Sequence, residues 1–230
     1  MQLKTLLATT PVRQVFGSVD RPVENIAYDS RRVQMNGMFV ALRGEKSDGH
    51  EFIGQAIEKG ASVIVAEREE QNPRATCLVV ENTRTALADF AATFYAYPER
   101  KLNLAAVTGT NGKTTITFLI KHICENAGLR CGLIGTVRYE IGERVLPAIR
   151  TTPESLDLQE LLAQIVNAGC KAAAMEVSSH ALAQDRTRGL EWNVAVFTNL
   201  TQDHLDFHGT MKSYFESKMK LFTGLGSQKK

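Results

Sequence analysis

The most informative segment of the sequence is Ala105-Ala-Val-Thr-Gly-Thr-Asn-Gly-Lys-Thr-Thr115. Its apolar start predicts a buried strand, its centre a tight polar loop, and the residues from Lys113 onward a helix. Glycines allow backbone amides to approach an anion closely, and the N-terminus of a helix adds partial positive charge. We therefore expect a phosphate-binding loop, in which Lys113 neutralises phosphate oxygens and the Thr114 hydroxyl binds Mg²⁺.

The expected nucleotide-binding loop consists of seven consecutive residues: Gly109, Thr110, Asn111, Gly112, Lys113, Thr114 and Thr115. It departs from the pattern GxxxxGK[ST], because the first glycine of that pattern would stand at the position of Val107. The alternative interpretation is a strand–turn–helix connection that is merely rich in glycine and threonine. The coincidence of strand, loop, Gly-Lys-Thr and helix favours the phosphate loop.

The composition is that of an ordinary globular protein and excludes several classes. The chain has 230 residues, of which 43% are hydrophobic and 23% are charged. Its net charge of +2 gives no indication of a nucleic acid or an anionic membrane as partner. No apolar run reaches the ~18 residues of a membrane span, and the four cysteines are scattered without a CxxC pair. We therefore expect a cytoplasmic protein without membrane insertion or a disulfide framework.

The order of the predicted elements indicates an α/β fold with two domains, residues 1–98 and 99–230, divided where a helical pattern ends at Pro98. In the first domain we expect strands over 37–42, 62–66 and 77–80 and helices over 51–59 and 83–95. In the second we expect strands over 102–107, 131–134, 172–177 and 193–198 and helices over 113–127, 153–168 and 211–222. Thr152 is the predicted N-cap of the helix over 153–168, with Pro153 at its first position. The continuous apolar strands are typical of a parallel sheet that is covered on both faces.

Polar side chains follow two of these strands, at the edge where an open parallel sheet binds ligands. Glu176 ends one apolar strand, and His204 lies in the polar segment after another. Together with Thr114, they would bring a carboxylate, an imidazole and a hydroxyl to neighbouring strand ends, as a Mg²⁺–nucleotide site requires. Taken singly, Glu176 could be a structural acid and His204 a solvated or capping residue. Lys218, on the last helix, has the pattern of a solvated lysine.

The chain also resembles a known family, the Mur ligases. The motifs that carry the resemblance are Thr108-Gly-Thr-Asn-Gly-Lys-Thr-Thr115, Arg150-Thr-Thr-Pro-Glu-Ser155, Met175-Glu-Val-Ser-Ser-His180 with Gln184 and Arg186, Asn199-Leu-Thr-Gln-Asp-His-Leu-Asp-Phe-His-Gly209 with Tyr214 and Lys218, and Tyr28-Asp-Ser-Arg31 with Gly37-Met-Phe-Val-Ala-Leu42. The likeness covers essentially the whole chain. Within the family it is greatest to the branch that adds the third amino acid to the peptidoglycan stem peptide.

The resemblance implies a role for individual residues. Ser30 would contact uracil in a first domain that binds UDP, and the loop over 44–50 would lie near the diphosphate. The muramoyl-dipeptide would be held by Thr151, Thr152, Ser178, Gln184 and Arg186. Glu176 and His204 would bind magnesium together with Thr114, and Lys218 would be carbamylated by CO₂. Lys113, His204 and Lys218 would then form the catalytic set. Arg150 departs from the asparagine that is common in related enzymes.

The implied activity is ATP-dependent amide formation through an acyl phosphate, with UDP-N-acetylmuramoyl-dipeptide and an amino acid, meso-diaminopimelate or L-lysine, as substrates. A monomer is expected. Family members are about twice as long, so we expect a partial central ATPase domain and weak or absent ligation by this chain. The alternatives are a nucleotide- or UDP-sugar-binding module without catalysis, or a related Mur or folylpolyglutamate-type ligase. The domain before the phosphate loop argues against the folate enzymes.

Overall fold

The computed structural model describes residues 1–230 except 45–46, 71, 73, 224 and 226–230. The chain divides into two compact units, Met1–Phe94 and Tyr95–Lys230. The division expected after residue 98 would fall inside the short 3₁₀ helix η3 (Pro98–Lys101). Among the described residues, no helix combines the length and the apolar character needed to cross a membrane.

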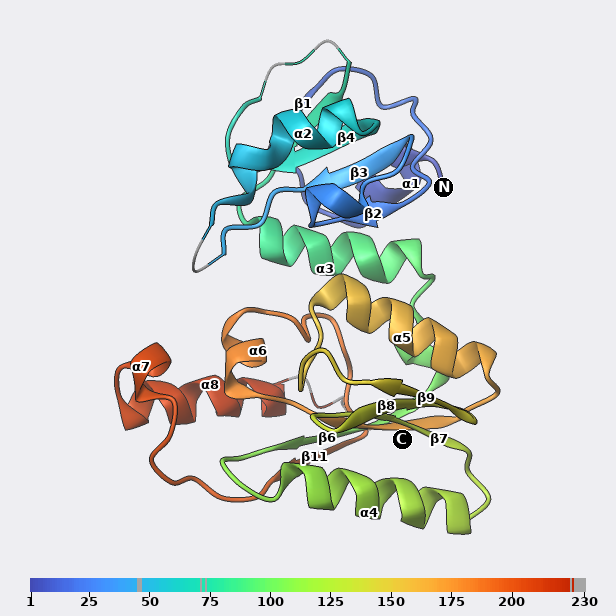
Figure 1. Cartoon of the computed structure of the whole chain (residues 1–230), viewed down its shortest axis with the longest axis vertical. Coiled ribbons are helices and arrows are strands. Elements are labelled where there is room, and N and C mark those ends of the chain that lie inside the picture. The colour runs from blue at the N-terminus through green and yellow to red at the C-terminus, as the bar shows by residue number, and fades with distance from the viewer. Residues whose placement is uncertain (45–46, 71, 73, 224, 226–230) are drawn as a thin grey trace. The chain divides into compact units, whose positions relative to one another are not determined.

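The first unit is a five-stranded sheet with helices on both faces (Figure 1). Its strands are β1 (Gln14–Phe16), β2 (Ile26–Ala27), β3 (Gly37–Val40), β4 (Ala61–Ala66) and β5 (Thr76–Val79). Their order is β1-β5-β4-β3-β2, with β1 antiparallel and the other pairs parallel. The helices are α1 (Leu3–Leu7), η1 (Ser30–Arg32), η2 (Gly49–Phe52), α2 (Ile53–Glu58) and α3 (Thr83–Phe94). The helix expected over 51–59 is thus split into η2 and α2, because the Asp48 side chain accepts from the His50 amide and caps a 3₁₀ turn first.

The second unit is a six-stranded sheet in the order β11-β6-β10-β7-β8-β9. Its strands are β6 (Asn103–Thr108), β7 (Cys131–Ile134), β8 (Arg138–Ile141), β9 (Arg144–Pro147), β10 (Ala172–Glu176) and β11 (Val194–Phe197). The pairs β11–β6, β6–β10 and β10–β7 are parallel, and the pairs β7–β8 and β8–β9 are antiparallel. Besides η3, its helices are α4 (Lys113–Asn126), α5 (Ser155–Asn167), α6 (Ser179–Ala183), α7 (Leu205–His208) and α8 (Met211–Thr223).

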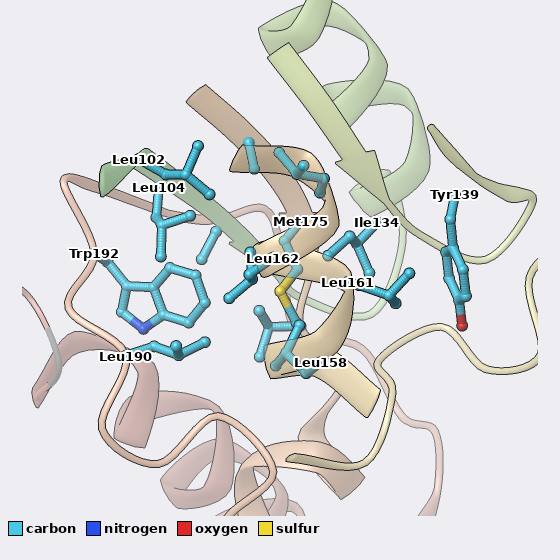
Figure 2. Packing of buried hydrophobic residues seen from close by; sticks show 14 of the residues in the cluster. Leu102, Leu104, Ile134, Tyr139, Leu158, Leu161, Leu162, Met175, Leu190 and Trp192 are labelled. Atoms are coloured by element: carbon cyan, nitrogen blue, oxygen red, sulfur yellow. The ribbon is translucent and has the colours of Figure 1, made fainter. Parts of the chain in front are cut away.

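Helices α4 and α5 cover opposite faces of this second sheet (Figure 1). Under α5 lies the main core, a cluster in which Met175 of β10 lies beside leucines of the helix and to which Trp192 also belongs (Figure 2). Under α4, Leu133 of β7 and Ala174 of β10 pack against the partly buried Phe118 and the helix around it. The inner parallel strands β6, β7 and β10 are almost wholly buried and are continuous apolar runs, as expected, whereas β11 at the edge is only partly buried.

The register of the sheet brings three strand ends to one level. Glu176 of β10 is paired with Val107 of β6, and Phe197 of β11 is paired with Thr108 of β6. The segments that come after these strands therefore leave the sheet at one edge. The candidate site is built on that edge.

Two expectations about the second unit are wrong in detail. The sheet has six strands where the apolar runs predict four, because β8 and β9 form a half-exposed hairpin: polar residues alternate with apolar ones in β8, and β9 is largely exposed. Helix α5 begins at Ser155 with Glu154 as N-cap, and Thr152 does not cap it. The Thr152 hydroxyl donates instead to the Glu176 carbonyl at 2.9 Å, which ties this segment to the end of β10.

Candidate functional site

The phosphate-loop segment connects the end of β6 to the start of α4. Gly109 and Gly112 have φ angles of 139° and 84°, a range that residues with a side chain rarely adopt. A Cβ atom on Gly109 would stand 1.9 Å from Oγ1 of Thr198, the residue that comes directly after β11. Glycine is therefore required at position 109 both for the backbone conformation and for the close approach of the neighbouring strand end.

The residues after β11 brace this loop. The Asn199 backbone carbonyl accepts from the Thr110 amide and its side-chain oxygen accepts from the Asn111 amide, each at 3.0 Å. The Thr198 hydroxyl donates to the Asn111 carbonyl at 2.6 Å. Because these two amides are already engaged, a bound phosphate would meet the amides from Gly112 onward, at the start of α4. This arrangement favours a shaping role for Thr110 and Asn111 within the expected loop.

Two lysine ammonium groups converge on the carbonyl of Gly109. Lys113 Nζ donates to the Gly109 carbonyl at 3.0 Å and to the Thr110 carbonyl at 2.8 Å. Lys218 Nζ, on α8, donates to the same Gly109 carbonyl at 2.8 Å. Burial lowers the pKa of Lys113, although the charges of Glu176 and Asp203 act in the opposite direction. The loop therefore gathers positive charge where a polyphosphate would lie.

Lys218 is buried, with only 1% of its surface exposed, so its interpretation as a solvated helical lysine is wrong. Its Nζ atom lies 4.4 Å from the centre of the Tyr214 ring. Burial, followed by the charge of Lys113, lowers the pKa of Lys218 to about 8, against the opposing charge of Asp203. A lysine with such a pKa holds a much larger neutral fraction near neutral pH than an ordinary lysine, and the neutral amine is the nucleophilic form.

Glu176 stands at the carboxyl end of β10 and is buried. Thr136, which lies just after β7, holds both of its carboxylate oxygens: the Thr136 amide donates to Oε1 at 2.9 Å and the hydroxyl donates to Oε2 at 3.0 Å. A Cβ atom on Gly135 would stand 2.4 Å from Oε1, so glycine leaves the room that this carboxylate occupies. Mg²⁺ is usually held by one or two carboxylates together with water and substrate phosphates. A fixed carboxylate beside the phosphate loop fits that pattern.

His204 lies at the N-cap of α7 in a left-handed conformation, with φ of 52°. Its ring meets the His180 ring edge-on at a centroid distance of 4.7 Å, and its Nδ1 atom is 3.4 Å from Asp203 Oδ1. Within the described ranges, no three His, Cys, Asp or Glu side chains converge into a metal-binding group. Glu176 and His204 therefore do not form a complete cage, and a cation would take further oxygen ligands from Thr114, phosphates or water.

The residues expected to hold the muramoyl-dipeptide form a connected network around the end of β10. They are Thr151, Thr152, Ser178, Gln184 and Arg186. The Thr152 hydroxyl donates to the Glu176 carbonyl and accepts from the Ser178 amide at 3.0 Å. The Ser178 hydroxyl in turn caps α6 by accepting from the Ala181 amide. These polar residues are thus fixed to the same strand end as Glu176.

Arg186 extends this network toward Glu154. Its guanidinium donates to the Thr152 carbonyl at 3.0 Å and to Gln184 Oε1 at 2.6 Å, and its Nε atom lies 3.4 Å from Glu154 Oε2. Arg150, which departs from the family pattern, has its guanidinium 4.0 Å from the same carboxylate. The structure therefore places Arg150 in an ion-pair cluster with Arg186 and Glu154.

Ser30 belongs to the first unit, where its hydroxyl donates to Gln55 Oε1 at 2.6 Å. It lies in η1, where the Asp29 side chain caps the turn by accepting from the Arg31 amide. In the loop expected near the diphosphate, residues 45 and 46 lie outside the described residues. His50, at the end of that loop, is buried: its Nδ1 atom pairs with Asp48, and its Nε2 atom accepts from the Glu67 amide.

Three residues of the second-unit site were given no role from the sequence: Thr136, and also Asn199 and Tyr214, which were named only within motifs of the resemblance. Thr136 and Asn199 each lie just after an apolar strand, so attention to the polar residues beyond every strand end would have found both. The Tyr214 hydroxyl lies 3.2 Å from Thr110 Oγ1 and joins α8 to the loop. No local pattern marks Tyr214, because its partner is distant in the sequence.

Comparison with known proteins places this geometry in a family. A model of the Mur ligase middle domain matches residues 107–230, and a model of the catalytic domain of the Mur ligase family matches residues 22–95. A UDP-N-acetylmuramoyl-L-alanyl-D-glutamate--2,6-diaminopimelate ligase from Clostridium tetani is 48% identical over 226 residues, which cover 96% of this chain and 47% of that protein. The chain therefore spans about half the length of the curated relatives it matches.

Solved structures agree with these matches. A structure of a UDP-N-acetylmuramoyl-L-alanyl-D-glutamate--2,6-diaminopimelate ligase superposes with a TM-score of 0.81 at 29% identity, covering 97% of this chain and 45% of that one. A more distant MurF ligase from Thermotoga maritima, in complex with ADP, gives a TM-score of 0.56 at 25% identity, covering 87% of this chain and 43% of that one. With both family models matched and the identity sustained over nearly all of its residues, the chain belongs to the Mur ligase family.

Proposed function

We propose that this chain carries the UDP-substrate-binding and ATP-binding parts of a ligase that adds the third amino acid to UDP-N-acetylmuramoyl-L-alanyl-D-glutamate. The observation that carries the proposal is the convergence of Lys113 and Lys218 on the Gly109 carbonyl, with Glu176 held at the next strand end. Cations, helix-start amides and a fixed carboxylate are what a magnesium–triphosphate requires. The names of the relatives favour diaminopimelate over L-lysine as the added amino acid.

The proposed reaction has two steps. An oxygen of the D-glutamyl carboxylate attacks the γ-phosphorus of ATP, the bond to the β-phosphate oxygen breaks, and ADP leaves. The amine of the amino acid then attacks the acyl carbon of the resulting acyl phosphate, and inorganic phosphate leaves with the electrons of the broken C–O bond. The first step brings two anions together, so the positive charge of Lys113 and the amides at the start of α4 would stabilise it.

Mg²⁺, when bound, would screen the negative charge of the triphosphate and orient its oxygens. The residues that would hold it are Glu176 and Thr114, with His204 at the neighbouring strand end. The hydrogen bonds from Thr136 fix the Glu176 carboxylate before any cation binds. The buried, partly neutral Lys218 suits carbamylation, because its amine can attack CO₂ and the product carries a negative charge near the cation site.

The first unit would hold the UDP portion of the substrate, with Ser30 near uracil. The hydrogen bond from Ser30 to Gln55 supports this proposal because it fixes the position of the Ser30 hydroxyl oxygen. The network of Thr151, Thr152, Ser178, Gln184 and Arg186 would hold the muramoyl-dipeptide. A cytoplasmic location and a monomeric state stay predictions.

Substitution of Lys113 tests the nucleotide site. Lys113→Ala should weaken binding of the Mg²⁺ complex of a non-hydrolysable ATP analogue by ~10- to 100-fold, because charge-assisted hydrogen bonds to phosphate are lost. Isothermal titration calorimetry measures this, and circular dichroism checks the fold. Lys212→Ala, which changes an exposed lysine of α8 paired with Glu216, is the matched control and should bind like the parent. Equal binding by parent and Lys113→Ala would refute the phosphate-loop assignment.

The second candidate function is binding without catalysis. The two candidates differ in one measurement: phosphate release from ATP in the presence of UDP-N-acetylmuramoyl-L-alanyl-D-glutamate and diaminopimelate. Substrate binding without any phosphate release would support the binding module, whereas sustained release that depends on the amino acid would support the ligase.

A further inference from the structure

We infer that Thr136 is a positioning residue that couples the cation carboxylate Glu176 to the substrate-side residue Thr151. This inference rests on the proposed function, because it assigns Glu176 and Thr151 the roles proposed above. Thr136 lies between β7 and β8, and it is exposed on the edge where the strand ends meet. It makes three polar contacts there: two with Glu176 and one with Thr151, whose Oγ1 atom is 3.0 Å from Thr136 Oγ1.

The donors and acceptors among Thr151, Thr136 and Glu176 can be assigned in only one way. A carboxylate can accept but not donate, so the single hydrogen of the Thr136 hydroxyl goes to Glu176 Oε2. The contact between the two threonines therefore uses the hydrogen of Thr151, and Thr136 accepts it. The result is a directed chain from Thr151 through Thr136 to Glu176, in which each hydroxyl orients the next group.

The neighbouring residues hold the Glu176 carboxylate in one position. Gly135 leaves space that any Cβ would fill, since that atom would stand 2.4 Å from Glu176 Oε1. The backbone amide of Thr136 fixes Oε1, and the hydroxyl fixes Oε2, so both oxygens are held by one residue. Partners of this kind orient a metal-binding carboxylate, and their loss typically weakens metal binding by roughly 10- to 100-fold.

Thr151 lies at the start of the segment that also contains Thr152, and the Thr152 hydroxyl donates to the Glu176 backbone carbonyl. The side chain and the backbone of Glu176 are therefore both tied to the Thr151–Thr152 pair, the former through Thr136. A ligand that forms a hydrogen bond with the Thr151 hydroxyl would change the hydrogen bond from Thr151 to Thr136. The hydrogen bond from Thr136 to Glu176 would change in turn. The cation site and the dipeptide site should consequently respond to each other.

The test is a double-mutant cycle on the metal dependence of nucleotide binding. For the full chain, calorimetry gives the affinity of a non-hydrolysable ATP analogue with Mg²⁺ and with EDTA, and the ratio of the two is the metal contribution. Thr136→Val removes the hydroxyl at nearly constant volume and should lower the ratio by roughly 10-fold or more while leaving the metal-free affinity unchanged. Thr136→Ser should restore the ratio, because it returns the hydroxyl.

Thr151→Val should lower the same ratio by only ~2- to 3-fold, and it should add nothing in the Thr136→Val background, since the chain is already broken there. Thr223→Val, which removes an exposed hydroxyl at the end of α8 that donates to the Lys220 carbonyl, is the matched control. The fluorescence of Trp192, the single tryptophan and a member of the second-unit core, reports whether each variant is folded.

The outcomes separate this inference from the proposed function. An unchanged ratio in Thr136→Val, or additive effects of the two substitutions, would overturn the coupling through Thr136 while the parent still shows metal-dependent binding. A parent chain that binds no nucleotide with Mg²⁺ would overturn the proposed function and the inference with it. A reduced ratio that Thr136→Ser rescues, together with non-additivity, would support both.

Discussion

Two buried lysines of the second unit, Lys121 and Lys218, have opposite surroundings. Lys121, on α4, forms ion pairs with Glu125 and with Glu140 of β8, the latter at 3.4 Å. Burial alone would lower the pKa of Lys121, but its hydrogen bond to Glu125 and the charge of Glu140 outweigh burial and raise it. Lys218 donates to a backbone carbonyl, and burial, followed by the charge of Lys113, lowers its pKa to about 8.

The difference indicates that Lys121 is structural and that Lys218 belongs to the ligand-binding site. A carboxylate neutralises Lys121 permanently, so this lysine can only anchor α4 to β8. Among the residues that the structure describes, no carboxylate is bonded to Lys218 or Lys113, as a site that receives an anionic ligand requires. Substitutions at the two positions should therefore change stability in opposite directions.

Lys121→Met should give the largest effect on stability. It leaves Glu140, whose side chain is 12% exposed, with Arg138 as its remaining partner at 2.7 Å, and removal of one member of a buried ion-pair cluster is destabilising. We expect the free energy of unfolding of the second unit to fall by about 2 kcal/mol, since Arg138 still pairs with Glu140 and Glu125 on the same helix is partly solvated. Urea unfolding followed by Trp192 fluorescence measures the change, and a rise in stability would break the comparison.

Lys218→Met should have the opposite sign and depend on pH. The folded pKa lies below the unfolded value, so the unfolded chain binds more protons between pH ~8 and ~10.5 and the parent gains stability as the pH rises through that window. At pH 7 the variant should be more stable than the parent by ~1–2 kcal/mol, after allowance for the lost hydrogen bond to Gly109. The advantage should shrink toward pH 10.

Comparing urea unfolding at pH 7 and at pH 10 tests this prediction, with Lys212→Met on the exposed face of α8 as control. A gap between variant and parent that is constant with pH would mean that Lys218 is not an uncompensated buried cation. The same variant should also lose any ¹³C NMR signal of a lysine carbamate that the parent shows with labelled bicarbonate.

Tyr214→Phe should give the smallest effect on stability, and it tests whether the Tyr214 hydroxyl influences the protonation of Lys218. The substitution removes the hydroxyl that contacts Thr110 but keeps the ring that faces the Lys218 ammonium. Stability should fall by ~0.5–1.5 kcal/mol. The pH window of the Lys218 effect should stay in place, and a shift of that window in pH titrations of the variant would show that the hydroxyl sets the protonation of Lys218.

Sequence patterns predicted well those parts of the fold in which local signals agree. The strand, glycines and helix around Gly109 all point to one structure, so β6 and α4 lie where expected. The start of α5 was misplaced, because Thr152 has a distant partner at the end of β10 that a capping rule does not consider. The β8–β9 hairpin was missed because polar and apolar residues alternate in β8 and β9 is largely exposed, so neither is a continuous buried apolar run.

The site was harder to predict than the fold, for a physical reason. Burial of Lys218 depends on contacts with a loop more than one hundred residues earlier in the chain, and helical periodicity alone treats a lysine as a solvent-facing residue. The resemblance to a family singled out Lys218, but the pattern of residues could not. The directed contacts of Thr136 likewise appear only when the ends of β7 and β10 are brought side by side.

Strand β11 has consequences for handling the protein. In the described part of the chain it has one ladder partner, β6, and stands at the end of the strand order. Its Val194 is half-exposed, and a strand edge of this kind offers backbone groups to any other extended segment. Concentrated samples should therefore be prone to edge-to-edge aggregation. Light scattering over a dilution series would show the concentration above which larger particles form.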